Sequence, residues 1–97
     1  MPMYVGLYKM TEKGAADMKK APERIKQLVK VWEAMGGTIS VVVATLGAYD
    51  YVTVGEAPSD EVAATFAAAL ASQGYVTTET LRGFKPEEFA ALLAKLP

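Results

Sequence analysis

The chain has 97 residues, of which 52% are hydrophobic and 22% are charged, as is typical of a folded domain. It contains neither cysteine nor histidine, which excludes disulfides, thiolate zinc sites and thiol nucleophiles and removes the commonest general base. Ten basic and eleven acidic residues give a net charge of −1, and this balance argues against a nucleic-acid-binding protein. The length predicts one domain over residues 1–97.

The charges are distributed unevenly along this domain. Residues 9–30 hold seven basic and three acidic residues, whereas residues 33–61 hold five acidic and no basic ones. This segregation indicates either attraction between neighbouring elements of one fold or head-to-tail contact between subunits.

No segment has the composition of a membrane span or of a signal peptide. The longest uncharged stretch, residues 62–78, has 17 residues and includes polar ones, whereas a spanning helix needs about 20 predominantly apolar residues. The N-terminus lacks a basic region followed by an apolar run. We therefore expect a cytoplasmic protein with no membrane partner.

The N-terminal part predicts a strand followed by a helix. Residues 3–9 alternate in character, which places Tyr4 and Tyr8 on the same face of a strand. Thr11 is a plausible cap for a short turn. Pro22 then opens a helix whose apolar stripe includes Trp32, and Gly36-Gly37 supplies a left-handed exit.

The rest of the chain predicts a hairpin, a helix, a strand and a final helix. Residues 38–45 and 50–56 read as two antiparallel strands joined by a short break. Ser59 caps a helix that ends at Gly74, and a fourth strand covers residues 75–82. Pro86 opens the terminal helix. Alanines surround the helix before Gly74, so either the terminal helix or a second subunit is expected to cover it.

This order of elements predicts an α+β, ferredoxin-like β-α-β-β-α-β fold with a C-terminal helix. Alternation places Val52 and Val54 on the face that the helices cover. The opposite, open face is expected to carry Tyr4, Tyr8, Tyr51 and Thr53. Such a surface usually meets a ligand or a partner. Two such sheets facing each other across a two-fold axis would cover both.

A set of short motifs is spread along most of the chain. The turn Leu46-Gly47-Ala48-Tyr49-Asp50 contains the spaced pattern Gly-x-Tyr-Asp, in which Ala48 interrupts a literal Gly-Tyr-Asp tripeptide. The other motif residues are Tyr4, Thr11-Glu12-Lys13-Gly14, Ala21-Pro22-Glu23-Arg24, Gly36-Gly37, Glu56-Ala57-Pro58, Gly74, Thr78 and Thr80. In their order and spacing these segments resemble the GYD domain family, which is named for that signature. The resemblance implies a ferredoxin-like fold of the dimeric α/β-barrel type and no established activity.

The signature also holds the candidate functional residues. Asp50 is either a turn residue that accepts hydrogen bonds from backbone amides or a base or ligand-orienting carboxylate. Tyr49 is expected to line the open face. Arg24 is either the ion-pair partner of an acid such as Glu56 or Asp50, or an anion-binding residue. The tentative ligand-binding set is Tyr4, Tyr8, Arg24, Tyr49, Asp50 and Tyr51.

Two functions from different classes remain open at this point. The first is a homo-oligomer, a dimer or larger, that binds a small organic molecule at the sheet face or merely assembles. The alternative is a cofactor-free enzyme of the barrel superfamily, such as a monooxygenase, isomerase or cyclase, which is an analogy from fold. No Asp-rich metal loop and no glycine-rich phosphate loop occurs in the sequence, so we expect neither a metal nor a cofactor.

Overall fold

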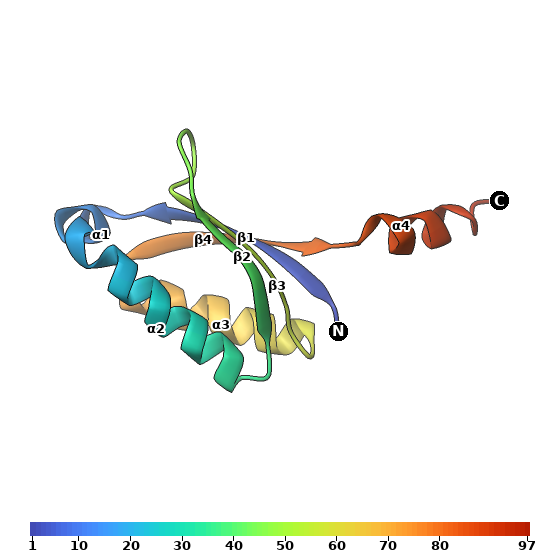
Figure 1. The fold of residues 1–97 in the computed structure, drawn as a ribbon, viewed down its shortest axis with the longest axis horizontal. Helices are drawn as coiled ribbons and strands as arrows, with labels where there is room; N and C mark the ends of the chain where they lie inside the picture. Colours follow the sequence, from blue (N-terminus) through green and yellow to red (C-terminus); the bar gives the residue numbers. More distant parts are fainter.

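A computed structural model describes all of residues 1–97, and its centre is a four-stranded antiparallel sheet. The strands are β1 (Met3–Met10), β2 (Thr38–Ala44), β3 (Tyr51–Glu56) and β4 (Val76–Gly83), in the order β2-β3-β1-β4. Two long helices, α2 (Ala21–Ala34) and α3 (Asp60–Gln73), cover one face of it (Figure 1). The α+β, ferredoxin-like prediction is confirmed.

Shorter elements complete the chain. The helix α1 (Glu12–Ala16) and the 3-10 turn η1 (Met18–Lys20) connect β1 to α2, and the helix α4 (Pro86–Leu93) follows β4. The predicted caps are present: Thr11 Oγ1 accepts from the Gly14 amide at 3.2 Å, and Ser59 Oγ accepts from the Val62 amide at 3.3 Å. Gly74 has a φ of +79° at the end of α3, a conformation that glycine adopts without strain.

Trp32 is at the centre of the core, as its position on the apolar stripe of α2 predicted. Its indole packs edge-on against Tyr4, with ring centroids 6.3 Å apart, and against Phe66 at 5.0 Å. Its Nε1 donates to the Thr38 carbonyl at 2.9 Å, which satisfies the one polar group of a side chain only 5% exposed. A Cβ on Gly37 would collide with this indole. The exit from α2 therefore requires glycine there.

The prediction of which sheet face the helices cover is wrong. Pairing puts Tyr8 opposite Tyr51, and Gly6 opposite Thr53; Tyr4 lies in the buried core, with Tyr8 packed against it. The four residues expected on the open face, Tyr4, Tyr8, Tyr51 and Thr53, thus lie beneath the helices. The tyrosine hydroxyls tolerate burial because they have partners: Tyr4 donates to Asp60 at 2.5 Å, and Tyr8 bonds Thr53 at 3.1 Å.

The open face is aliphatic instead. Its rows of paired residues include Val41, Val54, Val5 and Leu81, and then Val43, Val52 and Leu7. Val52 and Val54, expected under the helices, belong to this face. Of these side chains, Val41, Val43 and Leu81 are 42%, 45% and 45% exposed.

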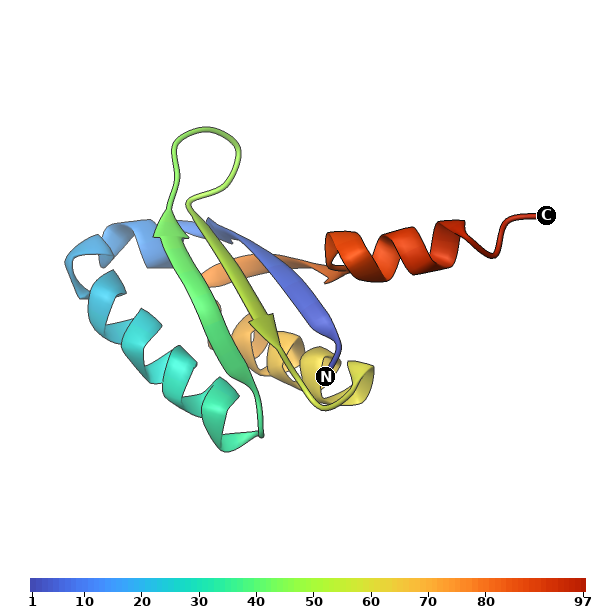
Figure 2. The same ribbon diagram turned by 45° about the vertical axis from the view of Figure 1, so that its right-hand side comes forward.

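The terminal helix α4 does not cover α3, which contradicts one of the two sequence-based expectations. It follows the end of β4 and projects beyond the sheet, away from α2 and α3 (Figures 1 and 2). Its apolar side chains are consequently exposed; they are Phe89, Leu92, Leu93 and, just after the helix, Leu96. The chain thus has two uncovered apolar surfaces, one on the sheet and one on α4.

Candidate functional site

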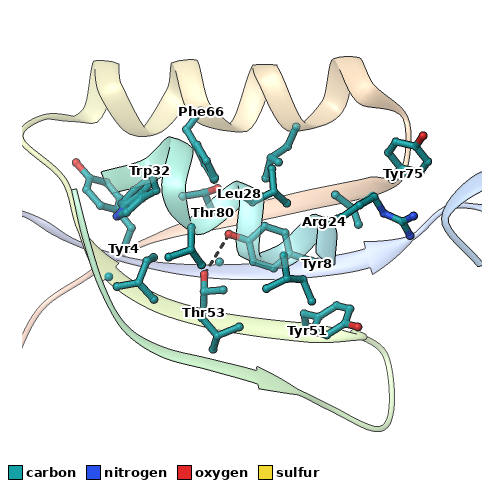
Figure 3. A pocket seen from close by; sticks show the side chains of 18 of the residues that line it. Tyr4, Tyr8, Arg24, Leu28, Trp32, Tyr51, Thr53, Phe66, Tyr75 and Thr80 are labelled. Carbon is teal, nitrogen blue, oxygen red and sulfur yellow. Dashed lines mark hydrogen bonds between the residues drawn. The ribbon is translucent and has the colours of Figure 1, made fainter. Parts of the chain in front are cut away.

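A cavity lies between the sheet and the helices that cover it. The helix α2 packs mainly on β2 and α3 mainly on β4, so the central strands β1 and β3 lie beneath the space between the two helices. The cavity there has a volume of about 90 Å³ (Figure 3). Of the predicted ligand-binding residues, Tyr4, Tyr8, Arg24 and Tyr51 line it, whereas Tyr49 and Asp50 do not.

Two of the hydroxyl groups that line the cavity are bonded to each other. The hydroxyl of Tyr8 lies above Gly6, where a Cβ would collide with it, and bonds Thr53 Oγ1 at 3.1 Å (Figure 3). Burial raises the pKa of Tyr8, and the bond to Thr53 opposes that shift. The tyrosine is therefore neutral at physiological pH and offers a hydroxyl, not a charge.

One end of the cavity is closed by aromatic side chains. Tyr4, Trp32 and Phe66 gather there and form part of the hydrophobic core (Figure 3). Burial, together with the hydrogen bond to Asp60, raises the pKa of Tyr4 to about 12. This end is therefore rigid and uncharged on its inner side.

Arg24 and Tyr75 lie at the opposite end, between the start of α2 and the end of α3 (Figure 3). The guanidinium of Arg24 is 4.4 Å from the Tyr75 ring centroid and 3.2 Å from the Asp17 carboxylate, and it also donates to the Gly14 carbonyl. The prediction that Arg24 pairs with Glu56 or Asp50 is therefore wrong. These contacts connect the start of α2 to Gly14 in α1 and to Asp17, which precedes η1. Because the Asp17 carboxylate neutralises the guanidinium, Arg24 adds no net charge to the cavity.

Asp50 is bonded to the backbone of β1. Its carboxylate accepts from the Met10 amide at 2.7 Å, and its own amide donates to the Tyr8 carbonyl at 2.8 Å. Its carbonyl accepts from the Thr45 amide at 2.9 Å. Asp50 therefore joins the end of β1 to the loop between β2 and β3, as expected for a turn aspartate.

Tyr49 is turned toward the open face. Its hydroxyl donates to Glu79 on β4, a residue paired with Leu7 and so on the aliphatic side of the sheet. This hydrogen bond and the negative charge of Glu79 raise the pKa of Tyr49. The enzyme alternative would use Tyr49, Asp50, Tyr51 and Arg24 together. These residues are separated, because Tyr51 and Arg24 line the cavity whereas Tyr49 and Asp50 do not.

Three polar residues that line the cavity, Tyr75, Thr80 and Gln73, were not among the sequence-based candidates. Thr80 pairs with Gly6, so correct assignment of the face of β1 would have found it. Tyr75 was predicted to begin the fourth strand, but β4 begins at Val76, so Tyr75 and Gln73 flank Gly74 at the end of α3. The alternation of a strand does not apply to residues in that position.

Two further structural findings concern metals and membranes. No three acidic side chains lie close enough together to hold a metal ion. None of the helices combines the length and the apolar composition that crossing a membrane requires.

Comparison with known proteins gives a relative and a family. A protein of Thermus thermophilus named "Glutamine synthetase and cystathionine beta-lyase binding protein" is 40% identical over 97 residues, covering 96% of this chain and 99% of the relative. No solved structure matches the chain. The profile of the GYD domain matches residues 4–93. The chain belongs to the GYD domain family.

Proposed function

We propose that the protein is a homo-oligomeric binding protein whose partner is an enzyme of amino-acid metabolism. The relative from Thermus thermophilus, similar over nearly its whole length, is named for binding glutamine synthetase and cystathionine β-lyase. The structural observation that carries the proposal is the presence of two separate apolar surfaces in one small chain. One surface would serve self-association and the other would serve the enzyme.

The open sheet face is assigned to a second copy of the chain. Its two central rows are almost entirely aliphatic, and the charged residues lie toward its borders, at Lys9, Glu56 and Glu79. Across a two-fold axis a surface meets a copy of itself, so an aliphatic patch of this kind would meet an equally aliphatic one. Each valine or leucine that becomes fully buried contributes about 1.5–3 kcal/mol, so pairing of two faces has a strong driving force.

The projecting helix α4 is assigned to the enzyme. Helical spacing puts Phe89, Leu92 and Leu93 on one side of it, with Ala91 on the other. An amphipathic helix held away from its own domain is suited to a hydrophobic groove on another protein. At the start of the helix, Lys85 forms an ion pair of 3.6 Å with Glu56.

The test is binding to purified glutamine synthetase and cystathionine β-lyase from the host organism, measured by calorimetry or analytical ultracentrifugation. We expect saturable binding of at least one enzyme and a loss of affinity of about tenfold or more in Leu93→Asp, since the charge would be buried in the interface. Ala91→Asp, on the other side of the same helix, is the matched control and should bind like the parent.

Two outcomes would contradict the assignment of α4. If Leu93→Asp binds the enzymes normally but has a lower oligomer mass, α4 covers a second copy of the chain. If neither enzyme binds the parent protein at micromolar concentration, the proposed partner class is wrong.

A further inference from the structure

Beyond partner binding, we infer that the cavity between the sheet and the two helices is a binding site for a compact, neutral, largely apolar molecule that carries one hydrogen-bond acceptor, such as a small ketone. The site is separate from the open face and from α4. If the cavity binds no ligand, the proposed partner binding is unaffected. If the partner enzymes do not bind, the cavity site is unaffected.

The charge of the cavity decides between a neutral and an ionic ligand. Arg24 is the only formally charged residue that lines it, and the Asp17 carboxylate at 3.2 Å neutralises that charge. The same guanidinium is further engaged by the Gly14 carbonyl and by the Tyr75 ring. An anion would have to compete with these contacts, and a cation would find no carboxylate among the lining residues. A neutral ligand meets neither cost.

Among the hydroxyls that line the cavity, the bonded pair of Tyr8 and Thr53 is assigned to the polar atom of the ligand. Tyr8 and Thr53 have one hydroxyl proton each, and the 3.1 Å bond between them uses only one of the two. Neither hydroxyl has another partner within the chain. One O–H is therefore free to donate into the cavity, and a carbonyl oxygen is a suitable acceptor.

The walls and the volume of the cavity determine the apolar character and the size of the ligand. Sixteen of the 22 lining residues are hydrophobic, among them Leu28, Ile39 and Phe66. The volume of about 90 Å³ is smaller than the roughly 150 Å³ of an engineered apolar cavity that binds benzene. It therefore suits a small ring or a short branched chain.

The experiment is an NMR titration of the full chain with cyclopentanone, and with cyclopentane as the probe that lacks an acceptor. We expect saturable shifts at millimolar cyclopentanone in residues that line the cavity, with cyclopentane binding more weakly.

The hydroxyl pair makes a specific prediction for the variants. In Tyr8→Phe the Thr53 hydroxyl keeps its proton and can donate to the ketone, and in Thr53→Val the Tyr8 hydroxyl can do so. Each single variant should therefore lose less than about twofold in cyclopentanone affinity. The double variant should lose about two- to twelvefold, while its affinity for cyclopentane stays the same. Tyr49→Phe, a tyrosine outside the cavity, is the matched control and should bind like the parent.

Three outcomes would overturn the inference. One is that neither probe shifts a lining residue, and another is that the double variant prefers cyclopentanone to cyclopentane as strongly as the parent does. Ile25→Phe covers the case in which the double variant unfolds, because Ile25 also lines the cavity and the larger side chain takes up space there while both hydroxyl groups are kept. Cyclopentanone affinity that survives Ile25→Phe unchanged would place the ketone elsewhere.

Discussion

The two faces of the sheet differ in a way that reverses the usual relation between polarity and burial. The covered face carries Tyr4, Tyr8 and Tyr51, whereas the face without any cover in the chain carries mainly valine and leucine. Burial of a tyrosine is tolerated when its hydroxyl finds a partner, and Asp60 and Thr53 supply such partners. An aliphatic side chain has no polar group that could be satisfied in this way, and we therefore assign the open face to a second copy of the chain.

The largest effect is expected on the covered face. Trp32→Ala should lower the free energy of unfolding by about 3–5 kcal/mol, because it removes the side chain against which Tyr4 and Phe66 pack. For a domain with about 5–15 kcal/mol in total, that is a large share. Urea denaturation measures it. The neighbouring Val31, 44% exposed, is the control, and Val31→Ala should cost less than about 0.5 kcal/mol. Equal losses would mean that Trp32 is not central to the core.

The open face makes the second prediction. Val43→Glu should weaken self-association by about a hundredfold or more, because a buried carboxylate without a partner costs about 3–5 kcal/mol. The folded monomer should remain, since Val43 is already 45% exposed within the chain. Sedimentation velocity measures the mass. Gln27→Glu adds the same charge on an exposed position of α2 and should leave the mass unchanged.

A parent protein that sediments as a monomer at micromolar concentration would contradict the assignment of the open face to a second copy. An unchanged mass in Val43→Glu would show that the subunits meet elsewhere.

Most of the fold follows from local signals, and the choice of face does not. Thr11, Ser59, Gly36 and Gly74 fix the ends of the helices through capping and left-handed backbone, which are properties of a few adjacent residues. Alternation along β1 separates Tyr4 and Tyr8 from Val5 and Leu7, but both sets are apolar enough to be buried. Which set meets the helices depends on distant partners such as Asp60, and alternation within one strand does not contain that information.

The same reasoning explains the candidate site. The tyrosines and Arg24 could be selected from the sequence because their types suit ligand contacts, and four of the six selected residues do line one cavity. The ion-pair partner of Arg24 could not be identified from the sequence, because the turn η1 is what brings Asp17 next to it. The direction of α4 could not be predicted either, because the sequence pattern of an apolar helix does not depend on whether the helix packs on its own domain or projects from it.

Asp50, at the edge between the two faces, should show an intermediate effect. Asp50→Ala leaves the Met10 amide without its partner and should cost about 1–2 kcal/mol of stability. Asp50→Asn retains an acceptor and should cost less. Denaturant unfolding of both variants measures this, with Tyr49→Phe as a nearby substitution that should be almost neutral. If Asp50→Ala is as stable as the parent but no longer binds the partner enzyme, Asp50 is functional and not a turn residue.

The smallest predicted effect is on the pH dependence of stability, and it concerns Tyr4 on the covered face. The pKa of Tyr4 is about 12 in the folded protein and 10.0 for an ordinary tyrosine, because burial and the bond to Asp60 favour the neutral hydroxyl. Between these values the unfolded chain binds fewer protons than the folded one, so stability is full below pH 10 and declines as the pH rises toward 12. Tyr4→Phe should be somewhat less stable at pH 8, where the hydroxyl bond is lost, and should decline less steeply above pH 10. Some decline should persist in it, since burial also raises the pKa of Tyr8. Urea unfolding at several pH values measures the slope, and a slope identical in the parent and in Tyr4→Phe would contradict a buried, protonated Tyr4 on the covered face.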